Sequence, residues 1–156
     1  MNNMDSLEIL DLAVRLEVVA SRIYHSLSGH FQAQPAVSEG FAKLSAEERQ
    51  HAARIQMLKS EYARDPEHFG QLTNAGWALE NLLVSSEQLL AQLEGPPMEL
   101  DLNSVIDVMV GFEEATADLH AERLAQAAPP NTAGFFQLLA KQDRKHAAFL
   151  RDQQFT

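Results

Sequence analysis

A carboxylate and an imidazole interrupt a helical pattern that otherwise places apolar residues on one face. The pattern runs from Val37 to Tyr62 in steps of three and four residues, and it includes Glu48 and His51. Residues three or four apart lie on the same side of a helix. Glu48 and His51 therefore direct an oxygen and a nitrogen toward one point beside the helix, which is half of the ligand set that a transition metal needs.

Three other segments have apolar faces interrupted in the same way. The interrupting residues are Glu17 near the N-terminus, Glu113 after residue 100, and Asp143 with His146 near the C-terminus. We assign Glu113 rather than its neighbour Glu114 to the inward face, because the latter falls on the polar side of the helix.

The spacing of these residues repeats between the two halves of the chain. Glu48 follows Glu17 by 31 residues, and Asp143 follows Glu113 by 30. In each half the second carboxylate is followed by x-x-His. We infer two copies of one helical hairpin, each with a lone carboxylate and then a carboxylate-x-x-His pair.

Such a set of buried charges would oppose folding unless cations balanced it. Each unpaired buried ion costs several kcal/mol, and a whole domain is stable by only about 5–15 kcal/mol. Two divalent ions would bring four positive charges against four carboxylates. Oxygen ligands with some nitrogen and no sulfur suit iron or manganese better than tetrahedral zinc. We predict that the metal ligands are Glu17, Glu48, His51, Glu113, Asp143 and His146.

Composition narrows the functional classes. The chain has 156 residues, a net charge of −10 and no cysteine. The length predicts a single domain, 1–156. The absence of a Lys/Arg cluster disfavours nucleic acid as a partner, and the absence of cysteine excludes disulfides and Cys-bound iron. No run of 18 apolar residues and no basic leader is present, so we expect no membrane association and a cytoplasmic location.

The periodicity predicts an all-α fold of four long helices. We expect the first to begin at Asp5 or Ser6, with Glu8 completing a capping box. Asn103 is the predicted N-cap of the third helix. Either Asn131 or Thr132 is predicted to cap the fourth. The expected helices are 6–29, 36–63, 103–127 and 132–154.

The segment between the second and third of these helices is too long for a plain loop. Residues 74–93 contain six leucines and Trp77 and predict an extra helix within the crossover. A long crossover allows two antiparallel hairpins to bring all the ligands to one level. We expect Trp77 to anchor this segment against the bundle.

Tyr24 and His120 occupy equivalent positions, each seven residues after a lone carboxylate. Each is interpreted either as a residue at the rim that satisfies its own polar atom or as a hydrogen-bonding partner of a ligand carboxylate. His120 has a third interpretation, as an additional metal ligand.

The run Glu17-x-x-Ala20-x-x-Ile23-Tyr24, together with Glu47-Glu48-x-x-His51, Glu113 and Asp143-x-x-His146, resembles the rubrerythrin branch of the ferritin-like superfamily. The resemblance implies a ferritin-like antiparallel four-helix bundle and a di-iron carboxylate site that reacts with peroxide or dioxygen. It also implies His51 on one iron and His146 on the other. We prefer Glu48 and Glu113 as bridging ligands, with Glu17 and Asp143 terminal. Manganese or a mixed pair of metals is an alternative to iron.

The chain departs from the family pattern at several points. Rubrerythrins carry a Cys-bound iron domain that feeds electrons, so here we expect a separate electron donor. Thr116 stands where they have an additional carboxylate, and Asp143 replaces the usual Glu. The ligands resemble those of bacterioferritin equally well, but Arg49 stands in place of its haem-binding Met, so no haem is expected.

Other functions share these ligands. One is ferroxidase activity with iron sequestration, which requires a large assembly, whereas we expect a homodimer. Another is hydroxylation of a small organic substrate, which requires an apolar pocket beside the metals. Met109, Phe112 and the crossover helix are the candidates to build one. The non-enzymatic alternative is an interaction bundle that has lost its metal.

Overall fold

The computed structural model describes residues 5–69, 72, 75–125, 128 and 130–153, which are helical apart from short connections and contain no strand. The long helices are α1 (Ser6–His30), α2 (Pro35–Arg64), α4 (Gly76–Glu94), α5 (Leu102–Asp118) and α7 (Pro130–Gln153). A single turn, α3 (Pro66–Phe69), follows α2, and a π-helical segment, η1 (Leu119–Leu124), continues α5. These bounds agree with the predicted helices to within a few residues, and the predicted ends at residues 74, 127 and 154 lie outside the described residues.

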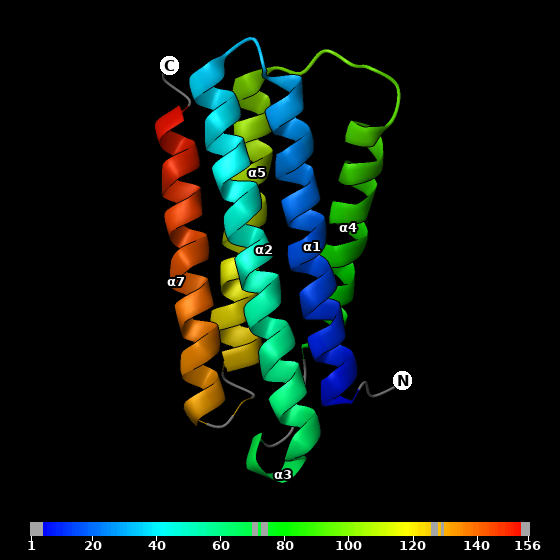
Figure 1. Ribbon diagram of the computed structural model, residues 1–156, viewed down its shortest axis with the longest axis vertical. Helices are drawn as coiled ribbons and strands as arrows, with labels where there is room; N and C mark the ends of the chain where they lie inside the picture. The colour runs from blue at the N-terminus through cyan, green and yellow to red at the C-terminus, as the bar shows by residue number, and fades with distance from the viewer. Residues whose placement is uncertain (1–4, 70–71, 73–74, 126–127, 129, 154–156) are drawn as a thin grey trace.

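The helices form two antiparallel hairpins packed side by side (Figure 1). One hairpin pairs α1 with α2, the other pairs α5 with α7, and the contacts within each hairpin are extensive. Contacts between α2 and α7 are few by comparison. In Figure 1 the chain crosses the top of the molecule between α4 and α5, so that α5 runs downward beside the first hairpin. The predicted crossover therefore brings the two hairpins together in one bundle.

The start of α1 has the predicted capping box. The Asp5 side chain accepts a hydrogen bond of 2.8 Å from the Glu8 backbone N–H, and the Glu8 carboxylate accepts one of 3.3 Å from the Asp5 N–H. Both bonds satisfy backbone donors that the first helical turn leaves without partners. This local signal fixes the phase of α1, and Glu17 consequently faces the core.

Two other predicted caps are wrong. The N-cap of α5 is Asp101, whose side chain accepts from the Ser104 backbone N–H at 3.0 Å, and Asn103 lies inside the helix. The last helix begins at Pro130 rather than after Asn131 or Thr132, because proline is tolerated in the first helical turn, where no intrahelical N–H bond is needed.

Small side chains hold α1 and α2 close together. Ser21 and Ser45 each donate a hydroxyl hydrogen bond to the backbone carbonyl of the other, at 3.0 and 2.8 Å. Ser28 and Ser38 repeat the arrangement, at 2.8 Å in both directions. On the other side of α2, Gly40 admits the Phe149 ring of α7, because a Cβ at Gly40 would lie 3.1 Å from it.

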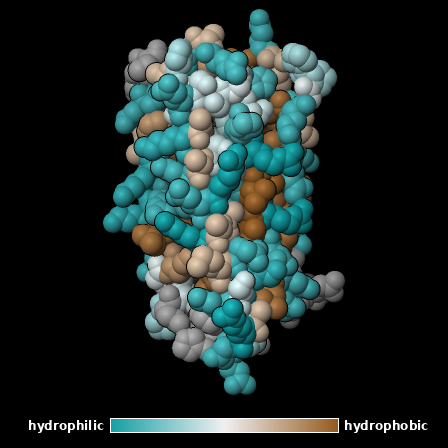
Figure 2. Space-filling model, in the orientation of Figure 1, coloured by the Kyte–Doolittle hydropathy of each residue, from teal (hydrophilic) through white to brown (hydrophobic). Residues whose placement is uncertain are grey.

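The crossover helix α4 lies against the outer side of α1. Leu79, Leu83 and Leu90 are buried, and Arg15–Glu87 and Arg22–Glu94 ion pairs of 2.9 and 2.6 Å flank the contact. Hydrophobic surface is visible near the groove between these helices (Figure 2). Trp77 does not anchor the helix as predicted, since 75% of its surface is exposed. The leucines of α4 perform that role.

Among the described residues no helix is both long enough and apolar enough to span a bilayer.

The predicted inward faces are confirmed by burial: the core contains apolar residues from all five long helices. Glu114 is exposed and pairs with Arg151, whereas Glu113 is fully buried.

Candidate metal centre

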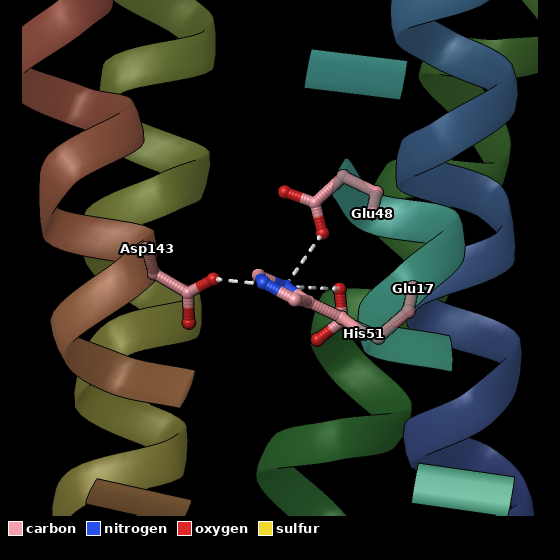
Figure 3. Close-up of side chains that lie close together, drawn as sticks. All are labelled: Glu17, Glu48, His51 and Asp143. Atoms are coloured by element: carbon pink, nitrogen blue, oxygen red, sulfur yellow. Dashed lines mark ion pairs between the residues drawn. The ribbon is translucent and has the colours of Figure 1, made fainter. Parts of the chain in front are cut away.

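The six residues predicted as ligands converge in the middle of the bundle. Each is at most 5% exposed, and the residues are Glu17 on α1, Glu48 and His51 on α2, Glu113 on α5, and Asp143 and His146 on α7. Figure 3 shows four of them, Glu17, Glu48, His51 and Asp143, pointing toward one another from three helices. The sequence prediction of inward-facing ligands therefore agrees with where the structure places these side chains.

The side chains form two overlapping groups that could each hold a metal ion. Glu17 and His51 belong to the first group and Glu113 and His146 to the second, while Glu48 and Asp143 belong to both. In each group one ligand atom per residue lies within 4.8 Å of all the others. This grouping differs from the preference for Glu113 as a bridging residue, because Asp143 and not Glu113 occurs in both groups. Asp143 has the same position in its hairpin as Glu48 has in the first hairpin.

The first group is centred on the His51 ring. Its Nδ1 lies 3.5 Å from Glu48 Oε2, 3.8 Å from Glu17 Oε2 and 3.9 Å from Asp143 Oδ1, as the dashed lines in Figure 3 show. One nitrogen and three carboxylate oxygens thus surround one point. This is the oxygen-rich donor set that iron and manganese accept.

The second group is centred on His146. Its Nδ1 lies 2.9 Å from Glu48 Oε1 and 3.4 Å from Glu113 Oε1. The two oxygens of Glu48 thus face different histidines, which is the geometry of a bridging carboxylate. The rings of His51 and His146 are stacked, with centroids 5.5 Å apart and planes inclined by 13°.

The other nitrogen of His146 contacts a residue that the sequence prediction did not assign to the site. Glu47 Oε2 lies 2.7 Å from His146 Nε2 and fixes the orientation of the ring. Glu47 is partly exposed and lies at the edge of the apolar face of α2, so burial patterns gave no reason to select it. Its position directly before Glu48 was the available signal.

Several buried ligand atoms have no hydrogen-bond partner among the described residues. They are both oxygens of Glu17, His51 Nδ1, Glu113 Oε2 and Asp143 Oδ1. A buried polar atom without a partner costs about 1–3 kcal/mol, and more when it is charged. Because Glu17 Oε2 and Asp143 Oδ1 lie within 3.9 Å of His51 Nδ1, a cation bound among them would satisfy all three. The donor set therefore fits a metal.

Protons take the place of metal charge in the metal-free arrangement. Burial lowers the pKa of His51, but its contacts with Glu17 and Glu48 outweigh burial and raise it to about 10. Burial also lowers the pKa of His146, and contacts with Glu113 and Glu48 raise it to about 11. Burial raises the pKa of Glu17, and the nearby Glu48 charge raises it further. Metal binding must displace these protons.

Tyr24 hydrogen-bonds to a ligand across the bundle. Its hydroxyl donates to Glu113 Oε1 at 2.6 Å, although Tyr24 lies on α1 and Glu113 on α5. Burial of the ring, together with the charges of Glu113 and Glu48, raises the Tyr24 pKa. The hydroxyl therefore keeps its proton and orients the carboxylate.

His120, in the second hairpin, contacts Glu17 of the first hairpin, just as Tyr24 of the first hairpin contacts Glu113 of the second. Its Nδ1 lies 2.7 Å from Asp143 Oδ2, and its Nε2 lies 3.3 Å from Glu17 Oε1. Burial lowers the pKa of His120, but the Asp143 and Glu17 charges raise it overall. Both carboxylates use their other oxygen toward His51, so His120 holds them from behind. This position agrees with a role as a hydrogen-bonding partner of the ligands.

The backbone around His120 is unusual. Residues 119–124 form the π-helical segment η1, in which the Ala125 N–H bonds to the His120 carbonyl. A π-helical turn widens the helix and commonly occurs at functional sites. The sequence contained no recognisable signal for this change.

Within the described residues, the cavity that Met109 and the crossover helix build does not reach the predicted ligands. A cavity of about 290 Å³ between α4 and α5 is lined by Met109 but by none of the six predicted ligands. A different cavity, between α2 and α7, reaches His51 and His146.

Comparison with known proteins identifies the fold and the family likeness. The rubrerythrin family model matches residues 8–81, which contain Glu17, Glu48 and His51. The first hairpin is therefore similar to the rubrerythrin family. This match ends in α4, so it does not include the ligands of the second hairpin.

The second hairpin is covered by the similarity to a solved structure. That structure is a protein from Thermotoga maritima described as a ferritin-like diiron-carboxylate protein. It is 18% identical, has a TM-score of 0.69, and aligns over 99% of this chain and 97% of its own. No curated protein matches the sequence. The predicted fold, a ferritin-like four-helix bundle with a helix in the crossover, is confirmed.

Proposed function

We propose that the protein binds two iron ions and acts as an oxidoreductase toward peroxide or dioxygen. The observation that carries the proposal is the pair of overlapping ligand groups that share Glu48 and Asp143. Two groups that have two carboxylates in common suit two metal ions that share those carboxylates. Manganese, or one ion of each kind, is the alternative loading.

The charges of the site support two divalent ions. Once the histidines are neutral, the negative charges of four buried carboxylates would balance the four positive charges of two divalent ions. When bound, a pair of reduced iron ions would supply electrons to an oxidant. A separate electron donor would then restore the reduced state.

The protein side chains have distinct roles in this proposal. His51 and His146 would each bind one ion and define its position. Tyr24 places a proton beside Glu113 Oε1. His120 holds Asp143 Oδ2 and Glu17 Oε1, which leaves the opposite oxygens free for metal.

Metal analysis and oxidation kinetics test the proposal. We expect about two iron ions per chain after purification, and faster oxidation of the ferrous protein by peroxide than by air. A fully folded protein with no iron or manganese would contradict metal binding. Oxidation by peroxide no faster than by air would leave the metal site but contradict the preference for peroxide.

The assembly state separates this function from iron storage. We expect a homodimer by size-exclusion chromatography with light scattering. A particle of many subunits that retains iron in large excess over two per chain would favour the ferroxidase and sequestration alternative.

A further inference from the structure

A surface cleft leads from solvent to the two histidines of the candidate metal centre. It has a volume of about 320 Å³, lies between α2 and α7, and is bordered at its inner end by His51 and His146. The cleft exists because these helices contact each other much less than the helices of either hairpin do. It is the approach to the centre from the histidine side.

The cleft is lined by both cationic and apolar groups. Its cations are Lys43 and Arg54 on α2 and Lys145 on α7, and Leu44 and Phe149 form its apolar part. The protein as a whole has a net charge of −10, so the cleft differs in charge from the average of the chain. Cations around a concave surface with low-dielectric walls concentrate anions there.

The cations are not neutralised by neighbouring acids. Among the parts of the chain that the structure describes, Arg54 and Lys145 have no ion pair. The Lys43 ammonium lies 5.7 Å from the centre of the Phe149 ring, over its face. Glu47 is the acidic residue lining the cleft, and it is already engaged by His146 at 2.7 Å.

An unsatisfied polar atom also borders the cleft. The side-chain oxygen of Gln142 is buried and has no hydrogen-bond partner among the described residues. Rotation of the amide by half a turn would present its NH₂ group instead. A ligand with oxygen atoms or hydroxyls would satisfy either orientation.

We propose that this cleft binds a small organic anion, a carboxylate or phosphate on a compact apolar body. Its charged group lies among Lys43, Arg54 and Lys145, and its body packs against Leu44 and Phe149. The volume is at the lower end for ligand sites, which limits the body to about the size of one aromatic ring. The proposal deepens the proposed function, because it names the class of reductant or substrate that meets the centre. Binding itself does not require the metals.

Calorimetric titration with matched probes tests the charge requirement. We expect sodium benzoate to bind the purified, metal-loaded protein at least about 10-fold more tightly than benzamide, which has the same shape without the charge. Inorganic phosphate is expected to bind more weakly than benzoate, because it lacks the apolar body. Equal affinity for benzoate and benzamide, or no binding of benzoate at about 10 mM, would overturn the proposal.

Charge-reversal variants locate the site. Arg54→Glu and Lys145→Glu are each expected to weaken benzoate binding by roughly 10-fold. The matched controls, Arg49→Glu and Arg144→Glu, make the same change of net charge on exposed positions of the same helices that do not line the cleft. We expect them to change the affinity by less than about twofold. An equal loss in the controls would show a nonspecific charge effect and overturn the site.

A third variant distinguishes the two parts of the ligand. Phe149→Ala is expected to weaken benzoate but not phosphate, and equal effects on both would contradict the proposed orientation. Iron and manganese content, measured on the same preparations, keeps the two proposals apart. Benzoate binding by a protein without either metal would support the cleft and reject the metal function, whereas bound metal without benzoate binding would do the reverse.

Discussion

In the α1–α2 hairpin, Tyr24 stacks on Phe41 with ring centroids 6.2 Å apart, and in the α5–α7 hairpin His120 stacks on Phe136 at 6.0 Å. Each stacked residue contacts the lone carboxylate of the opposite hairpin. The two halves therefore have the same arrangement but different polar groups, a phenol in one and an imidazole in the other. This difference makes the two candidate metal positions unequal.

The contacts within the two hairpins differ in the same way. Ser21 and Ser45 join α1 to α2 by hydrogen bonds, whereas the corresponding Ala117 and Ala140 are buried without any side-chain hydrogen bond. The first hairpin is thus fixed by directional bonds. The second relies on close packing and contains the π-helical turn. We infer that the first hairpin is the more rigid support and the second the more adaptable one.

The shared carboxylate gives the largest expected effect. Glu48 has one oxygen toward each histidine, so Glu48→Ala is expected to remove both metal ions. Glu17→Ala and Glu113→Ala are each expected to leave about one ion per chain, because each belongs to a single group. Metal analysis of purified protein measures the difference.

Glu114→Ala is the control for these substitutions, since it removes an exposed carboxylate next to Glu113. It is expected to keep both ions. Retention of two ions by Glu48→Ala would contradict the prediction, because neither group could then depend on the shared residue.

The pH dependence of stability should have opposite signs with and without metal. In the metal-free protein the pKa values of His51 and His146 are raised from 6.5 to about 10 and 11. Their contribution to stability is therefore complete below about pH 6.5 and is lost as the pH rises toward 10 and 11. We expect a loss of a few kcal/mol in unfolding free energy between pH 6.5 and 9.

The metal-loaded protein should behave in the opposite way, because ligation releases protons and metal affinity rises with pH. Urea unfolding across this pH range, with chelator or with metal, measures both trends. A metal-free protein that becomes more stable as the pH rises would contradict the protonated state of the histidines.

The residues that differ between the hairpins should affect the two metal positions separately. Loss of a group that orients a ligand typically weakens metal binding by roughly 10–100-fold. His120→Phe is expected to weaken the position that contains Glu17, and Tyr24→Phe the position that contains Glu113. Isothermal titration with a redox-inactive divalent metal resolves the two steps. His25→Phe, at an exposed position of α1, is the control.

The serine contacts should give the smallest effect. Ser45→Ala removes hydrogen bonds to Ser21 and is expected to cost about 1 kcal/mol of unfolding free energy. In the second hairpin, Ala140→Ser alone should destabilise, because it buries a hydroxyl without a partner. Adding Ala117→Ser should recover part of the loss. A double-mutant cycle measures this coupling, and a cycle without coupling would show that the hairpins differ in backbone spacing as well as in side chains.

Much of the site could be predicted because its signal is local and periodic. A charged residue in an apolar helical face is visible in the sequence, and the face then determines which way it points, as burial of Glu113 beside exposed Glu114 shows. The capping box at Asp5 was equally local. Trp77 was misplaced because its environment depends on how α4 lies on α1, which periodicity does not determine.

The sequence by itself determined the helices, their inward faces and the identity of the converging polar side chains, because helical geometry converts spacing into direction. Only the tertiary structure decided that Asp143 rather than Glu113 is shared, that Tyr24 and His120 reach across to the opposite hairpin, and that a cationic cleft adjoins the histidines. Those features depend on the rotation and separation of helices that are far apart in the chain. Packing of the whole bundle sets both quantities.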